Sequence, residues 1–329
     1  LERHLAYAGT GLAGLFARSR QIFDPGFWGF LRQILRFNKQ AQNDLAAGVL
    51  DDLTLGDYLD RLHASPRLRR DYLAPMTQAI WSSPEAKALD APAGPFLRFF
   101  DNHGLLDQAK MPQWRYIKGG SRTYVRAFAE QFPGRILLGN PVQAVTRETG
   151  HGPLVRSAGG ETRYDAVIMA VHADQALALL ADPEDVEYKA LGPWNYSHNR
   201  TVLHCDTTHM PTYARAWACW NVLRQAESTA VQPVQVTYWM NRLQQLSAHS
   251  AWLVSLNPYP AIPSEKMVYE TEYAHPVYTQ ETTAAQELLT GISGRRQTYF
   301  CGSYHGYGFH EDGARSGALV ARNHFGIAL

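Results

Sequence analysis

Apolar residues in the first 110 positions recur with the spacing of amphipathic helices. Within the segment 24–49, one helix face is formed by residues at the i, i+1, i+4, i+5 spacing, namely Phe30, Leu31, Ile34 and Leu35. Two shorter helical segments follow and are separated by prolines. Thr54 and Ser65 precede these segments, and both residue types commonly cap helix N-termini. The pattern therefore predicts a mainly helical N-terminal part.

From about residue 115 to residue 185 the pattern changes to strands and turns with helices between them. The predicted elements are a helix at 123–132, a strand pair at 135–149 broken at Asn140-Pro141, a hairpin at 154–165, a buried strand at 165–171 and a helix at 173–183. Strands that alternate with helices in this way are typical of an α/β domain.

The segment from about 195 to 285 consists of short, aromatic and β-branched stretches separated by turns, which predicts an antiparallel sheet. The predicted strands are 201–206, 216–222, 234–241, 250–257 and 275–280. The chain as a whole is therefore expected to have a mixed α/β (α+β) fold.

The C-terminal section returns to a strand, a glycine-rich loop and a helix. An apolar strand ends at Gly302, and a helix is expected to begin near Gly313 with Asp312 as its N-cap. Gly313, Gly317 and Ala321 recur every four residues, so one helix face is almost bare. Such a face permits close approach of a sheet or a ligand, and a helix N-terminus favours a polar or anionic group. Tight packing without any ligand explains the same pattern equally well.

Composition narrows the range of partners. The chain of 329 residues carries 31 Lys and Arg against 30 Asp and Glu, a net charge of +1 that offers no basic field for nucleic acid. A small-molecule partner is expected, and the oligomeric state is left open. The three cysteines are widely spaced, which argues against a disulfide framework and fits a cytoplasmic location. No apolar run is long enough to span a membrane, and no signal peptide is recognised.

Gly9, Gly11 and Gly14 spell G-x-G-x-x-G, the pattern of a dinucleotide-binding loop. That loop requires a buried strand before it, yet the preceding residues include Glu2, Arg3 and His4. We therefore interpret these glycines as a flexible small-residue segment.

His305, His310 and Glu311 cluster within seven residues and raise the alternative of a metal-dependent enzyme. Their spacing is not H-E-x-x-H, and the loop that contains them is glycine-rich, so no metal site is assigned. Nor does the chain contain the serine elbow of hydrolases or the phosphate loop of nucleotide hydrolases.

Several long motifs in order resemble one family. The segment 299–321, with Gly313, Ala314, Ser316 and Gly317, resembles the C-terminal flavin-binding segment of the amine oxidase and phytoene desaturase superfamily. The segments 75–84, 96–106, 113–125, 199–206 and 308–313 are similar to the bacterial predicted NAD/FAD-binding proteins of that superfamily. The resemblance covers nearly the whole chain.

This resemblance implies FAD as the cofactor and an interleaved domain order. A helical part of the substrate domain would span 1–112 and its antiparallel sheet 189–292. The FAD-binding, Rossmann-like domain would comprise 113–188 and 293–329. The family's dinucleotide fingerprint lies ahead of the segment with which this chain begins, so the chain is expected to be a truncated family member.

The resemblance also implies roles for particular residues. The cofactor-binding residues would be Val142, Ala170, His172, Gly302, Ser303, Glu311, Asp312, Gly313 and Ala314. Val142 would contact the adenine through its backbone. Many amine oxidases have Gly-Glu where this chain has Gly302-Ser303, so the usual acidic contact is in doubt. Tyr304, Tyr307 and His310 are the candidates for catalytic positions near the flavin.

Two functional hypotheses follow. The first is an FAD-dependent oxidoreductase that transfers hydride from a substrate C–H to flavin, in amine oxidation or in desaturation of a lipid or isoprenoid chain. The large aromatic content favours an apolar substrate slightly. The alternative is a truncated, non-catalytic remnant that binds flavin weakly or not at all.

Overall fold

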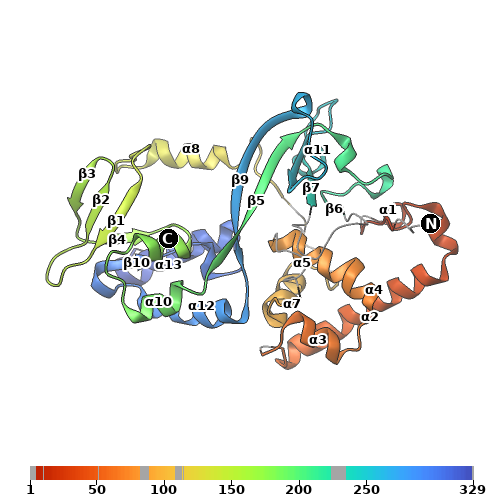
Figure 1. The fold of residues 1–329 in the computed structure, drawn as a ribbon, viewed down its shortest axis with the longest axis horizontal. Coiled ribbons are helices and arrows are strands. Elements are labelled where there is room, and N and C mark those ends of the chain that lie inside the picture. Colours follow the sequence, from red (N-terminus) through yellow and green to blue (C-terminus); the bar gives the residue numbers. More distant parts are fainter. Residues whose placement is uncertain are drawn as a thin grey trace. The chain divides into compact units, whose positions relative to one another are not determined.

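The chain forms two compact units, each assembled from two separate segments. The computed structural model describes residues 5–9, 11–50, 52–81, 89–107, 113, 115–223 and 235–327. Unit 1 comprises Leu1–Lys118 and Ser197–His275, and unit 2 comprises Gly119–Tyr196 and Pro276–Leu329 (Figure 1). The predicted domain boundaries near 112, 188 and 292 lie 6 to 17 residues from those of the units, and the largest difference places one helix, α12, in unit 2.

The first segment of unit 1 is helical, which confirms the prediction for this part. Its elements are α1 (Leu12–Leu15), η1 (Ser19–Phe23), α2 (Pro25–Ala47), α3 (Leu55–Arg61), α4 (Pro66–Leu68), η2 (Arg69–Leu73), α5 (Ala74–Trp81) and α7 (Ala93–Asn102). The Thr54 hydroxyl accepts a hydrogen bond from the Asp57 N–H, and the Ser65 hydroxyl accepts one from the Leu68 N–H. Both predicted N-caps are therefore confirmed.

Helix α2 begins and ends where its sequence directs, but its buried face differs from the prediction. The Asp24 carboxylate accepts from the Gly26 N–H, and Gly48 closes the helix in a left-handed conformation. The buried residues are Phe27, Phe30, Phe37 and Ala41, whereas Leu35 is 69 % exposed. The phenylalanines of α2 are buried because the helix contacts other helices, including α7 and α4. These contacts decide which part of its apolar surface is covered.

The glycines at 9 to 14 lie in unit 1. Gly9 lies in a segment without regular structure, and the four-residue helix α1 follows Gly11. Residues 5–8 form no strand, which agrees with rejecting a dinucleotide loop here, and Glu2, Arg3 and His4 lie outside the described residues.

The second segment of unit 1 contributes to an antiparallel sheet, as predicted. The strands are β5 (Asn195–His204), β6 (Trp220–Leu223), β7 (Gln235–Trp239), β8 (Leu253–Leu256) and β9 (Met267–Val277), in the order β6-β7-β8-β5-β9. Between β7 and β8 lies the short helix α11 (Met240–Leu243). Strand β9 starts well before the predicted segment 275–280. Its first part was not predicted, because residues 268–270 and 272–273 are exposed and show no apolar alternation.

The described residues of unit 2 form two small sheets and several helices (Figure 1). Strands β1 (Val142–Thr146), β2 (Leu154–Ser157) and β3 (Gly160–Arg163) form an antiparallel sheet, and β4 (Val167–Met169) pairs in parallel with β10 (Thr298–Phe300). The helices are α8 (Arg122–Gln131), α9 (Ala173–Leu179), α10 (Asp185–Leu191), α12 (Gln280–Ile292) and α13 (His310–Phe325). The α/β class, the hairpin and the helices at 123–132 and 173–183 are thus confirmed.

One predicted strand of unit 2 is wrong, and one predicted helix begins slightly earlier than expected. Residues 135–138 form no strand, and Leu138 is 90 % exposed, so the expected strand pair reduces to β1. The apolar residues of 135–138 form no strand, because no strand among the described residues pairs with this segment. Helix α13 begins at His310, three residues before the predicted start near Gly313.

A buried ion pair joins β1 to α10. Arg147 follows β1 and is 1 % exposed, and its guanidinium bonds both oxygens of the fully buried Glu187. The Arg147 Nε donates to the Asp182 carboxylate at 3.0 Å, and Arg296 bonds the same carboxylate at 2.6 Å. Burial alone would lower the pKa of Arg147, but the hydrogen bonds to Glu187 and Asp182 raise that pKa overall. The guanidinium therefore stays charged and joins the end of β1 to α10.

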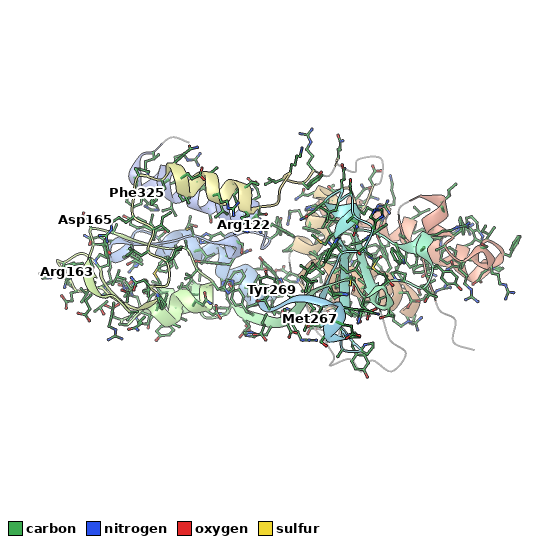
Figure 2. The ribbon with its side chains drawn as sticks, turned by 90° about the horizontal axis from the view of Figure 1, so that it is seen from above. Arg122, Arg163, Asp165, Met267, Tyr269 and Phe325 are labelled. Carbon is green, nitrogen blue, oxygen red and sulfur yellow. The ribbon has the colours of Figure 1, made fainter. Side chains whose placement is uncertain are left out.

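Helix α8 leaves its apolar side chains uncovered. All ten of its residues are exposed, and Phe128 is 62 % exposed. Figure 2 labels Arg122 at the start of α8 and Phe325 at the end of α13, two helices of unit 2 that carry exposed apolar side chains.

We expect Glu187→Ala to destabilise the chain by about 3–5 kcal/mol, because the buried Arg147 charge then loses the Glu187 carboxylate. The double replacement of Arg147→Met with Glu187→Leu should cost far less, since no charge then remains buried. Urea unfolding of both variants measures the difference, with Glu161→Ala on exposed β3 as control. Equal losses for the single and the double replacement would contradict the assignment.

We expect Phe128→Ser on α8 to change the free energy of unfolding of this chain by less than about 0.5 kcal/mol, because the side chain is exposed. Phe100→Ala on α7 should instead cost about 3–5 kcal/mol, because that ring is fully buried. Thermal and urea unfolding compare the two. A large loss for Phe128→Ser would mean that α8 packs against part of the chain after all.

Candidate functional site

The parallel pairing of β4 with β10 brings two chain segments to one sheet edge. Phe300 lies opposite Met169, and the Cys301 N–H donates to the Met169 carbonyl at 3.1 Å. A Cβ placed on Gly302 would lie 3.3 Å from the Val171 carbonyl oxygen. The residues that follow these strands therefore meet, as the carboxyl ends of parallel strands do at ligand sites of α/β folds. These residues are Ala170, His172, Gly302 and Ser303.

Helix α13 begins beside this edge. The Ser316 hydroxyl accepts from the Gly302 N–H at 2.9 Å and donates to the Gly313 carbonyl at 2.8 Å. One side chain thus connects the end of β10 to the first turns of the helix. Ser316 belongs to the flavin-segment motif, but sequence reasoning gave it no role of its own.

Asp312 shapes the loop that leads into α13. Its carboxylate is 5 % exposed and accepts from the Tyr307 N–H at 3.0 Å and from the Phe309 N–H at 3.1 Å. It also forms an ion pair with Arg315. Asp312 therefore is not the N-cap that the sequence suggested. It lies at the third helical position and satisfies the N–H of the residue before the helix, because α13 starts three residues earlier.

The start of α13 presents a bare face. The nearest atom to a Cβ on Gly313 would be the Ser303 N at 3.7 Å, and a Cβ on Gly317 would meet nothing within 4 Å. Ala314 and Glu311 are exposed on the same helix. An open face of small residues at the N-terminus of a 16-residue helix can accept a flat or anionic group in close contact with the backbone. These residues fit the flavin that the sequence resemblance implies.

The three candidate catalytic residues have different surroundings. Tyr304 is 1 % exposed and packs edge-on against Trp194, and its buried hydroxyl has no hydrogen-bond partner among the described residues. Burial raises the pKa of Tyr304 above its usual range. His310 is exposed, and its Nδ1 lies 3.5 Å from the Tyr124 hydroxyl of α8. Tyr307 is half-buried in the loop held by Asp312.

His172 follows β4, and Val142 begins β1 in the other sheet of unit 2. The His172 ring stacks on Tyr196 with centroids 4.3 Å apart, and the Tyr196 hydroxyl accepts from the Ala173 N–H. Burial raises the pKa of Tyr196 to about 12, so this hydroxyl stays protonated. Val142 begins β1 in the other sheet and is 41 % exposed. Tyr196 was missed because nothing in its local sequence distinguishes it from a core tyrosine.

The metal interpretation finds no support in the described part of the chain, where no group of three His, Cys, Asp or Glu side chains could hold an ion. The three cysteines are free.

Among the residues that the structure describes, no helix combines the length and apolar character needed to cross a membrane.

Comparison with known proteins gives a family and a fold. Residues 17–212 match the sequence profile of flavin containing amine oxidoreductases. No curated protein matches the chain significantly. Among solved structures, the CLA-producing fatty acid isomerase from P. acnes aligns with a TM-score of 0.64 at 14 % identity, covering 89 % of this chain and 74 % of that one.

Two further structures share the fold. A redesigned variant of putrescine oxidase has a TM-score of 0.63 at 14 % identity and covers 90 % of this chain and 75 % of its own. Cyclohexylamine oxidase from Brevibacterium oxydans has a TM-score of 0.57 at 13 % identity, with 91 % and 76 % covered. Identities this low establish the fold alone.

We expect Asp312→Ala to loosen the loop 303–309, because two backbone N–H groups and Arg315 lose their acceptor. The cost should be about 1–2 kcal/mol. Hydrogen exchange of the loop amides measures the change, and Glu311→Ala, at the exposed neighbouring position, is the control. Unchanged exchange in Asp312→Ala would show that the carboxylate does not hold the loop.

Proposed function

Because this chain belongs to the family of flavin-containing amine oxidoreductases and is an FAD-dependent oxidoreductase, we propose that it oxidises a substrate C–H bond at the strand edge of unit 2. The observation that carries the proposal is the convergence of the β4 and β10 ends with the bare start of α13. FAD bound at this edge would itself accept the hydride equivalent. The chain's own residues bind and orient it.

In this proposal the backbone supplies most of the contacts. Gly302 and Ser303 approach the ribityl-phosphate region, while Gly313 and Ala314 border the ribityl chain and the pyrimidine edge of the flavin. Ser303 offers a hydroxyl where an acidic side chain is usual. Asp312 is occupied by the loop and by Arg315, so its contribution is to hold the backbone in place.

The remaining candidates lie around this centre. Ala170 and His172 border the adenosine or pyrophosphate, Val142 contacts the adenine through its backbone, and Glu311 contacts the cofactor from the exposed start of α13. Tyr307 and His310 border the ring. Tyr304 is buried against Trp194 and, in this arrangement, supports the loop from beneath.

The substrate proposed is a small molecule, either an amine or a lipid or isoprenoid chain, with a slight preference for an apolar one. The aligned structures do not decide between these classes, since one is named as a fatty acid isomerase and another as putrescine oxidase. A cytoplasmic location is part of the same proposal.

One observation favours weak binding of flavin by this chain alone. The parallel sheet of unit 2 has two strands among the described residues, and the G-x-G-x-x-G segment lies in unit 1. A pyrophosphate normally binds the N–H groups at a glycine-rich loop that follows a strand of the same sheet. The second candidate function is therefore a non-catalytic chain with low affinity for FAD.

The first test is the visible absorption spectrum of the purified chain after incubation with excess FAD and desalting. We expect a retained, perturbed flavin band, and Gly313→Val should lower FAD affinity at least tenfold because its side chain enters the bare face. Titration of FAD fluorescence gives the dissociation constants.

Gly291→Val on α12 is the matched control, because that helical glycine has nothing within 4 Å of its Cβ position and Gly313 has only the Ser303 N at 3.7 Å. Both variants carry a similar helix penalty, so a difference in affinity reports the cofactor face. Equal affinities would place the flavin elsewhere. A chain without any flavin band would favour the non-catalytic alternative.

A further inference from the structure

A second polar cluster lies buried in the sheet of unit 1. It joins the end of β5, the helical turn η4 (Thr207–His209), β7 and β8. Its buried members are His204, Asp206, His209, Gln235, Thr237 and Ser255. Figure 2 labels Met267 at the start of β9, directly after Lys266, whose ammonium pairs with Asp206 at 3.0 Å.

Hydrogen bonds fix His204 in one neutral form. The Asp206 backbone N–H donates to the His204 Nδ1 at 3.1 Å, so this nitrogen must be unprotonated. The His204 Nε2 therefore carries the proton and donates to the Ser255 hydroxyl at 2.8 Å, which in turn lies 2.7 Å from the Thr237 hydroxyl. The neutral ring thus links β5 to β8 and, through Ser255, to β7.

The same reasoning fixes His209. The Gln235 Oε1 accepts from the Tyr259 N–H at 3.2 Å, which orients the amide so that its Nε2 donates to the His209 Nδ1 at 2.8 Å. The proton of His209 therefore lies on Nε2, a buried atom with no hydrogen-bond partner among the described residues. Both imidazoles are held neutral by donors that point at their Nδ1 atoms.

Electrostatics oppose a charge on either ring. Burial, together with the neighbouring His209, lowers the pKa of His204 to about 4, and Asp206 counteracts this only in part. Burial also lowers the pKa of His209, with Lys266 adding to the effect while Asp206 opposes it. Lys266 and Thr208 keep Asp206 ionised, although burial alone would raise the pKa of this carboxyl. The two ring centroids are 5.3 Å apart, so two charged imidazoles would repel each other.

We propose that His204 and His209 form an acid-sensitive lock that holds β5, β7 and β8 together only while both rings are neutral. A proton added to either Nδ1 meets an N–H donor in place of an acceptor, so the hydrogen bond there must break. Acidification therefore opens the sheet of unit 1 locally, whether or not a cofactor is bound to unit 2.

The direction of the pH effect follows from the protons bound. An unfolded histidine titrates near its ordinary pKa of about 6.5, well above the pKa of about 4 for folded His204. The open state therefore binds more protons between these values, and the lock weakens as pH falls from about 6.5 to about 4. The opening equilibrium should rise by up to about tenfold per pH unit from His204 in that window, and His209 changes it in the same direction.

Hydrogen exchange of the full chain at pH 7.0 and pH 5.0, corrected for intrinsic exchange rates, tests the lock. We expect protection of the β5, β7 and β8 amides to fall at least tenfold at pH 5.0. Unchanged protection in these strands would overturn the proposal. The readout does not involve flavin, so it is independent of the proposed enzymatic function.

His204→Gln and His209→Gln remove one titrating ring each and should flatten the pH dependence of protection in these strands. His249→Gln, at an exposed position of unit 1, is the matched control and should leave the pH dependence unchanged. A pH dependence equal to that of the unmodified chain in both cluster variants would overturn the proposal.

If a variant fails to fold, histidine NMR of the unmodified chain decides. The signal of His204 should remain that of a neutral ring at pH 5.5, and His209 should become charged only below the ordinary pKa of a histidine. Charging of both rings near pH 6.5 with the strands still protected would overturn the lock. His305 of unit 2 also has a pKa lowered by burial to about 4, so its signal must be assigned separately.

Discussion

The parallel pairing of β4 with β10 is the constraint on which the candidate site depends. The two strands come from distant parts of the sequence, and their pairing brings Ala170 and His172 to the same edge as Gly302 and Ser303. Ser316 then converts the strand edge into a cradle by bonding Gly302 and the first turn of the helix with one hydroxyl.

A buried side chain is charged in unit 2 and another is neutral in unit 1, for reasons of hydrogen bonding. In unit 2, Arg147 stays ionised because Glu187 and Asp182 provide acceptors on all sides. In unit 1, His204 stays neutral because a backbone N–H already occupies its second nitrogen. A buried ionisable group thus takes the form that its surrounding donors and acceptors can satisfy.

Family membership and site geometry answer different parts of the functional question. The family gives FAD and oxidoreductase chemistry, and the geometry gives a place where a flavin fits. Neither selects the substrate, because in the proposed arrangement the residues around Gly302 and Gly313 would bind the cofactor through the backbone, whatever molecule is oxidised.

The sequence by itself determined the local elements and the flavin motif. Apolar spacing, caps such as Thr54 and the glycine pattern after β10 act within a few residues, so they can be interpreted without the fold. Only the tertiary structure decided that Asp312 lies inside α13, that Leu35 is exposed and that residues 135–138 form no strand. It also decided that Ser316, Tyr196 and the two buried histidines have partners far away in the sequence. These outcomes depend on which surfaces meet, and a local pattern of apolar and polar residues does not specify that.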